Sequence, residues 1–378
     1  FNPNAVSDTQ HALPSAGPNG ATGQTVTFVG QIVSGNGAFY EWATGAEIKA
    51  NNSEPDWRWA NNESTSELQL VRSGPRFNTS VSVSGEMAAP HAIFIREDGK
   101  KAYITDNSSN NVFQYNLNTA WDISSATFDN ESVLVGGAAE EPRGLSFKPD
   151  GAKMYVLGRA NQRVSQWTLS TPWDISTASF DGVLLNVKSE EDTPQDIFIA
   201  NGGERLYVSG NQTGAVNQYT FSTPWDLSTA TFDNKSLNIS GQGGVPTGVF
   251  LRSDGIKLYT LGFGDQKLFQ YTLSTPRDVS SATFDGVSFD IGDEDTAPTS
   301  IFFKKDGNKF FMTGADNANL YEYVVTNSWD ISSGNFDALS LVYVDDTQAK
   351  VYINGQFVQD FDPSDGNIQG SAPDFIAN

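Results

Sequence analysis

Few side chains in this sequence could carry out acid–base or metal chemistry. The chain has no cysteine and two histidines, His11 and His91, so thiolate metal sites, disulfides and thiol nucleophiles are excluded. Carboxylates are abundant, with 45 acidic against 23 basic residues and a formal net charge of −22. So acidic a chain repels phosphate groups, which argues against nucleic-acid partners. No apolar run is long enough for membrane insertion.

The carboxylates gather at three places along the chain, namely Glu140–Glu141, Glu190–Asp192 and Asp293–Asp295. Carboxylate oxygens are ligands that calcium prefers, so Ca²⁺ is the one cofactor that the sequence leaves open. The spacing of a dedicated calcium loop is absent, and a run of like charge more often forms a solvated face. We therefore expect no cofactor and no metal site.

These clusters belong to a repeat of 52 residues. Its most regular landmark is a proline, found at Pro90, Pro142, Pro194, Pro246 and Pro298. A Trp-Asp pair, with Arg277 in place of tryptophan in the fourth unit, and a Phe-Asp pair recur at the same interval. Apolar and polar residues alternate between these landmarks, and turn dipeptides such as Asp98-Gly99 separate the runs, which indicates short β-strands. Four strands in about 50 residues are typical of one β-propeller blade.

The number of blades depends on where the first strand pairs. Residues 77–85 are similar to the fourth-strand segment 232–241, so we expect this N-terminal strand to complete the last blade. The ring would then have five blades and span residues 77–337. The alternative assigns residues 337–344 to the fifth blade and implies six or seven blades.

The two ends of the chain resemble laminin-G and concanavalin-like β-sandwiches. The resemblance rests on Leu339–Asp346 and Lys350–Val358 downstream of the repeats, and on Ala38–Trp42 and Glu67–Val71 upstream. It implies a jelly-roll sandwich built from both ends. The predicted organisation is an all-β chain with an extended arm (1–20), the first half of the sandwich (21–76), a five-bladed propeller (77–337) and the second half of the sandwich (338–378).

The repeat units resemble those of structural proteins of marine tailed phages, and similar repeats occur in secreted bacterial propellers. The resemblance rests on segments such as Phe147–Gly158 and Ser170–Ala178. It implies a fibre, spike or decoration component on a virion or an extracellular surface, and it transfers no catalytic residue. Arg277 departs from the tryptophan of the pattern, which puts the packing of that connection in doubt.

Residues that differ between blades are better candidates for ligand binding than residues that repeat, because identical positions usually pack blade against blade. The innermost strand begins after each repeated proline, so variable residues there surround one mouth of the central channel. The candidates for a polar ligand are His91, Arg143, Gln195, Asp196, Thr247 and Thr299. The alternative is a solvated loop edge.

Catalysis by a propeller glycosidase would need two matched carboxylates in the channel. The five equivalent innermost positions carry one carboxylate, in the set Ala92, Gly144, Asp196, Gly248 and Ser300. We therefore predict no catalytic residue and a non-enzymatic surface protein that acts in assembly, with host-glycan attachment as an additional role. Its partners would be other structural subunits, copies of itself or a cell-surface glycan. The alternatives are a secreted bacterial adhesin or lectin and, less favoured, a glycosidase.

Overall fold

The computed structural model describes residues 75–332, except 201, 243–244 and 326–327, together with isolated strands in the flanking segments. The chain divides into two compact units, residues 77–332 and the two ends taken together, 1–76 with 333–378. The predicted arm, residues 1–20, lies outside the described residues. No helix in the described part of the chain is long and apolar enough to span a membrane.

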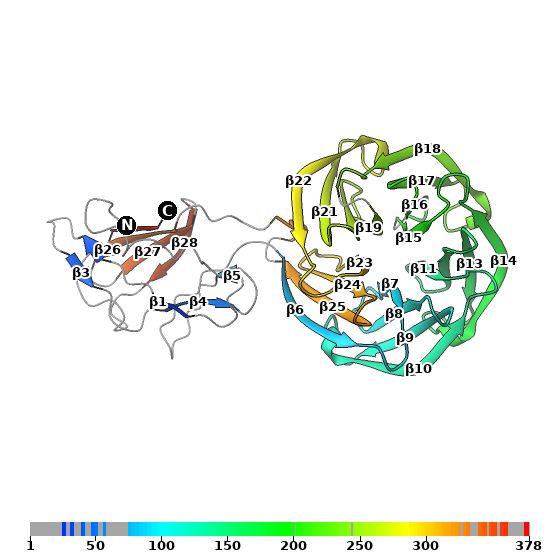
Figure 1. The fold of residues 1–378 in the computed structure, drawn as a ribbon, viewed down its shortest axis with the longest axis horizontal. Coiled ribbons are helices and arrows are strands. Elements are labelled where there is room, and N and C mark those ends of the chain that lie inside the picture. Colours follow the sequence, from blue (N-terminus) through cyan, green and yellow to red (C-terminus); the bar gives the residue numbers. More distant parts are fainter. Residues whose placement is uncertain are drawn as a thin grey trace. The chain divides into compact units, whose positions relative to one another are not determined.

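Residues 75–325 form five antiparallel sheets of four strands each, arranged as blades around an axis (Figure 1). Blade 1 comprises β7 (Pro90–Ile95), β8 (Lys101–Asp106), β9 (Asn111–Leu117) and β10 (Ala126–Leu134). Blade 2 comprises β11 (Pro142–Phe147), β12 (Lys153–Gly158), β13 (Arg163–Leu169) and β14 (Ala178–Asn186). Blade 3 comprises β15 (Pro194–Ile199), β16 (Arg205–Gly210), β17 (Ala215–Phe221) and β18 (Ala230–Asn238). Blade 4 comprises β19 (Pro246–Leu251), β20 (Lys257–Gly262), β21 (Lys267–Leu273) and β22 (Ala282–Asp290).

Blade 5 is assembled from distant parts of the chain. Its inner strands are β23 (Pro298–Phe303), β24 (Lys309–Gly314) and β25 (Asn319–Val325), and its outer strand is β6 (Pro75–Ser82). Just past β6, the Val83 amide donates a hydrogen bond to the Ala318 carbonyl at 2.9 Å. The predicted five-bladed ring, closed by the N-terminal strand, is therefore confirmed. The last Phe-Asp pair, at Phe336, falls outside the described residues.

The innermost strands, β7, β11, β15, β19 and β23, surround the axis in Figure 1. The hydrophobic core lies between neighbouring blades, where one second-strand tyrosine per blade is fully buried in blades 1 to 4. Each tyrosine hydroxyl donates a hydrogen bond of 2.5–2.9 Å to a backbone carbonyl of the next blade, in the pairs Tyr103–Trp173, Tyr155–Trp225, Tyr207–Arg277 and Tyr259–Trp329. Blade 5 has Phe311 at this position, and there Lys309 Nζ donates to the Trp121 carbonyl at 2.9 Å instead.

The residue that accepts these bonds has an uncommon backbone conformation. Its φ is positive in all five blades, from 63° at Trp121 to 68° at Trp329, and 64° at Arg277. The side chain covers the glycine of the first turn so closely that a Cβ on Gly99 would stand 2.3 Å from the Trp121 ring. In blades 1 to 4 the following aspartate caps a short 3₁₀ turn, at η2 (Ile123–Ser125), η3 (Ile175–Thr177), η4 (Leu227–Thr229) and η5 (Val279–Ser281). The repeated Trp-Asp pair is thus a packing feature, and Arg277 keeps its backbone geometry.

The pairing of β6 with blade 5 uses a reversed version of a bond found in the other blades. In blades 1 to 4 a glutamine amide donates to the aspartate of the Phe-Asp pair, in the pairs Gln114–Asp129, Gln166–Asp181, Gln218–Asp233 and Gln270–Asp285. In blade 5 the Asn78 amide donates to the carboxylate of Glu322 at 2.9 Å. In blades 1 to 4 the third strand carries the donor and the fourth strand the acceptor, whereas in blade 5 the outer strand β6 carries the donor and β25 the acceptor. The side chains of β6 are therefore complementary to those of β25.

Strands from the two chain ends pair with each other. One six-stranded sheet has the order β28-β27-β26-β29-β2-β3, and a three-stranded sheet has the order β1-β4-β5. The upstream strands are β1 (Thr25–Thr27), β2 (Gln31–Val33), β3 (Phe39–Glu41), β4 (Glu47–Asn51) and β5 (Asp56–Trp57). The downstream strands are β26 (Leu339–Asp345), β27 (Gln348–Ile353), β28 (Gln356–Phe361) and β29 (Asp374–Ala377).

The exchanged pair gives a direct test of ring closure. Asn78→Asp places a second carboxylate against the buried Glu322, so we expect it to lower the free energy of unfolding by about 2 kcal/mol. Adding Glu322→Gln recreates the aspartate–glutamine pair of the other blades and should restore most of the loss. Urea denaturation of the two single variants and the double variant measures this coupling. Additive effects would show that β6 and β25 do not pair.

Candidate functional site

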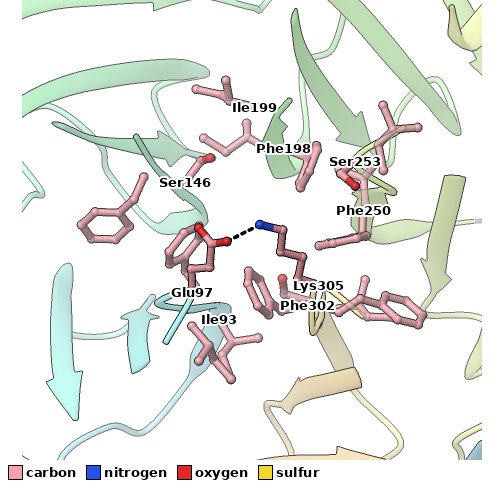
Figure 2. A pocket seen from close by; sticks show the side chains of 18 of the residues that line it. Ile93, Glu97, Ser146, Phe198, Ile199, Phe250, Ser253, Phe302 and Lys305 are labelled. Atoms are coloured by element: carbon pink, nitrogen blue, oxygen red, sulfur yellow. Dashed lines mark hydrogen bonds and ion pairs between the residues drawn. The ribbon is translucent and has the colours of Figure 1, made fainter. Parts of the chain in front are cut away.

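The central channel contains a cavity of about 120 Å³ between the innermost strands. Part of its wall is a collar formed by the fifth residue of each innermost strand. Four of these residues are phenylalanines and the blade 2 residue is a serine, in the set Phe94, Ser146, Phe198, Phe250 and Phe302. Figure 2 shows Ser146, Phe198, Phe250 and Phe302 around the cavity.

The four phenylalanines form an unbroken series of ring contacts. The ring centroids of Phe94 and Phe302 are 5.2 Å apart, those of Phe302 and Phe250 are 5.8 Å apart, and those of Phe250 and Phe198 are 4.9 Å apart. These are ordinary distances for tilted and edge-to-face aromatic packing. The collar series ends at blade 2, where Ser146 takes the place of a fifth phenylalanine; Phe94 contacts Phe147 of that blade instead, with ring centroids 5.1 Å apart.

Asp196 lies deeper in the cavity and is almost completely buried, with an exposed fraction of 3%. It accepts hydrogen bonds from the Ile197 amide at 2.8 Å, the Ser300 hydroxyl at 3.0 Å and the Val249 amide at 3.3 Å. Burial raises the pKa of Asp196 well above its usual range, although these three bonds oppose the shift. Asp196 therefore connects blades 3, 4 and 5, and its burial favours the neutral acid.

Glu97 of blade 1 and Lys305 of blade 5 form an ion pair at the opposite end of the cavity, drawn as a dashed line in Figure 2. Both side chains are more than 60% exposed. An ion pair this exposed contributes little to stability. It gives the rim of a mostly apolar cavity one positive and one negative group.

The predicted ligand residues lie where the innermost strands begin, at the other end of the channel. His91, Gln195, Thr247 and Thr299 are all buried, with exposed fractions of 4–6%. Several of them bond to the next blade around the ring. The Thr247 hydroxyl lies 2.9 Å from the Pro298 carbonyl, the Thr299 hydroxyl lies 3.2 Å from the Pro90 carbonyl, and Arg143 bonds to Gln195. The structure thus places all six candidates around the channel, and Asp196 alone among them also lines the cavity. Their role in ligand binding stays a prediction.

A basic cluster lies at this end in blade 2. Burial, together with the charge of Arg159, lowers the pKa of Arg143 to about 10. Burial and the same two guanidinium groups lower the pKa of His91 to about 3, so this imidazole is neutral. The Nε atoms of Arg143 and Arg159 are buried and have no hydrogen-bond partner among the described residues. Glu141 accepts one bond from Arg159 at 2.8 Å.

The acidic clusters are partly structural. Glu191 is 1% exposed and accepts backbone hydrogen bonds from Thr193, Gln212 and Thr213. Asp295 accepts equivalent bonds from Ala297 and Asn317. In the part of the chain that the structure describes, no group of three or more acidic or histidine side chains could hold a metal ion. The calcium hypothesis has no support among these residues.

Sequence reasoning missed the apolar cavity. Phenylalanines at a repeated strand position look like ordinary core residues, whereas polar residues that differ between blades indicate a ligand site. The available signal was Ser146, the one polar residue in a position that is otherwise phenylalanine.

Fold and site together define a five-bladed β-propeller with an apolar channel cavity. No protein-family model and no curated sequence matches the chain. Among solved structures it is similar to a luciferin-regenerating enzyme, with a TM-score of 0.42, 13% identity, and coverage of 69% of this chain and 98% of that one. It is also similar to the Cps50 (Swd1) β-propeller domain of Myceliophteria thermophila, with a TM-score of 0.40, 11% identity, and coverage of 67% and 100%. These likenesses concern the fold alone.

One acidic side chain should make stability depend on pH. Burial, with Asp293 and Asp290 nearby, raises the pKa of Glu294 from 4.5 to about 7. Because the folded pKa is the higher one, its contribution to stability is complete below the unfolded pKa and is lost as pH rises through about 7. We expect Glu294→Gln to flatten the fall in unfolding free energy between about pH 5 and about pH 8. Glu140→Gln removes the same charge from an exposed side chain and is the control. An equal change in both variants would contradict the assignment.

Proposed function

We propose that this chain is a non-enzymatic structural protein of a virion or an extracellular surface, in which the propeller serves as a rigid domain for assembly. The resemblance of the repeats to phage structural proteins supports the location. The way the ring is closed supports the role of a rigid domain in assembly. Side-chain to backbone bonds join successive blades at the tyrosine positions and at Lys309, and β6, the first strand of the propeller, completes the last blade. Such a domain is suited to bearing load or presenting a surface.

The pairing of the chain ends supports the proposed jelly-roll sandwich. Val33 of β2 pairs with Asp374 of β29, and β29 pairs with β26. Strands from before and after the propeller therefore share a sheet, as expected if the propeller is inserted into a loop of a sandwich. The sandwich would then provide the second domain of the structural protein.

The arrangement of channel carboxylates supports a role without catalysis. Asp196 is surrounded by three donors, and Glu97 pairs with Lys305 on the exposed rim. Glycoside hydrolysis needs one protonated and one ionised carboxyl group on either side of the scissile bond. Asp196 at the bottom of an apolar cavity has no such partner among the described residues.

A second candidate function is glycan attachment, as in an adhesin or lectin. The observation that favours it is the basic cluster of Arg143 and Arg159, whose Nε atoms have no hydrogen-bond partner in the described part of the chain. Guanidinium groups recognise carboxylate and sulfate groups through paired hydrogen bonds. The glycan would therefore carry acidic sugars, and it would bind at the mouth where the innermost strands begin.

The non-enzymatic proposal predicts that the purified protein hydrolyses no polysaccharide. Reducing-end release from a panel of neutral and acidic glycans should equal the buffer background. Asp196→Asn should leave that background unchanged. Turnover above background that disappears in Asp196→Asn would replace the proposal with a glycosidase.

Glycan attachment predicts binding to acidic glycans on an array, and weaker binding to their neutral counterparts. Arg143→Gln and Arg159→Gln should each reduce the signal about tenfold, which corresponds to about 1.4 kcal/mol. Arg163→Gln, on an exposed side chain of the same blade, should have no effect. A flat array, together with detection of the chain in purified particles by mass spectrometry, would leave assembly as the function.

A further inference from the structure

One blade departs from the collar that lines the channel cavity. Four blades place a phenylalanine at the fifth position of the innermost strand, and blade 2 places Ser146 there. We propose that this cavity is a binding site for a small aromatic molecule of a single ring that carries a hydroxyl group. The inference does not depend on the proposed function, because it concerns a different part of the channel and a different chemistry.

The size of the cavity limits the ligand. A dry apolar cavity of roughly 150 Å³ binds benzene, and that comparison comes from an engineered cavity in another protein. The cavity here measures about 120 Å³, which suits one ring with a single small substituent. A sugar ring surrounded by polar hydroxyls would lose its water here and find few hydrogen-bond partners in return.

The shape of the cavity favours an aromatic ring over an aliphatic group. The collar is a series of edge-to-face and tilted ring contacts from Phe94 through Phe302 and Phe250 to Phe198, and it is interrupted at blade 2. A ring bound beside Ser146 would take the place of the absent fifth phenylalanine. It would lie between Phe198 and Phe94 and complete the series, where each aromatic pair contributes about 0.5–1.5 kcal/mol beyond the burial of area.

Ser146 also supplies the hydrogen bond that selects a hydroxyl group. Its side chain lines the cavity and makes no hydrogen bond to another described residue. Two other buried polar groups of the lining, Asp196 and Ser300, are already engaged, because Ser300 donates to Asp196 at 3.0 Å. Ser253 also lines the cavity but is exposed, so among the described residues the buried Ser146 hydroxyl is the group best placed to bond a ligand inside it.

The Glu97–Lys305 rim of the cavity favours a small molecule as the occupant over a segment of a partner protein. The Glu97–Lys305 ion pair spans the opening in Figure 2, where it would obstruct a protein segment more than a single ring. Both side chains are long and exposed, so they can separate to admit a small molecule and then close over it. A partner's side chain inserted into the channel would require the pair to remain open.

The test uses toluene and phenol as probes of the full-length protein, with thermal shift and isothermal titration as readouts. Both probes should raise Tm, and phenol should bind several-fold more tightly than toluene. Ser146→Ala should remove the preference for phenol and keep toluene binding. Ser146→Phe installs the residue found in the other four blades and should weaken both probes at least tenfold by filling the space.

If Ser146→Phe fails to fold by circular dichroism, Phe198→Ala provides the second variant. It enlarges the same cavity and should shift the preference from phenol to 2-naphthol. The proposal is overturned if neither probe binds the native protein at millimolar concentration, if Ser146→Phe folds and binds both probes normally, or if only an aromatic-containing peptide binds.

Discussion

The ring depends on the residue that occupies the left-handed backbone conformation in every blade. Its carbonyl accepts the hydrogen bond from the preceding blade, its amide bonds to the turn glycine, and its side chain covers that glycine. A positive φ is costly for tryptophan, so the surrounding contacts must offset the strain. Arg277 keeps the amide and carbonyl bonds, which shows that the backbone geometry, more than the indole ring, joins one blade to the next.

The closure between blades 5 and 1 follows the same scheme with different chemistry. Phe311 has no hydroxyl group to donate, so Lys309 bonds to the Trp121 carbonyl and also pairs with Glu322. Glu322 in turn accepts the Ile123 amide at 3.1 Å, the role that glutamine has in the other blades. The exchanged donor and acceptor at Asn78 complete this network. The closure between blades 5 and 1 thus uses hydrogen-bond partners that the other blades lack. These partners favour the pairing of β6 with blade 5 over its pairing with the outer edge of any other blade.

Much of this fold could be predicted from the sequence because the 52-residue interval carries no insertion at its landmarks. The likeness of residues 77–85 to a fourth strand was enough to predict closure. The sequence showed Ser146 as the exception at a phenylalanine position, but it did not show that this position lines the channel, because periodicity alone does not show which strand residues face the axis and which face a neighbouring blade. The hydrogen-bond partners of the candidate ligand residues could not be predicted from the sequence either. Thr247 and Thr299, for example, bond to carbonyl groups of the following blade. Side chains that differ between blades can therefore join one blade to the next, as the repeated side chains do.

Ring closure requires β6 to be a full member of blade 5. Native-state hydrogen exchange measures this directly, because a strand held by cooperative closure opens only when the ring opens. Amides of β6 that bond to β25 should be protected to the same degree as those of β22, the outer strand of a blade formed from continuous chain. Exchange of the β6 amides at the rate of an unstructured segment, with β22 still protected, would contradict a ring closed by its own first strand.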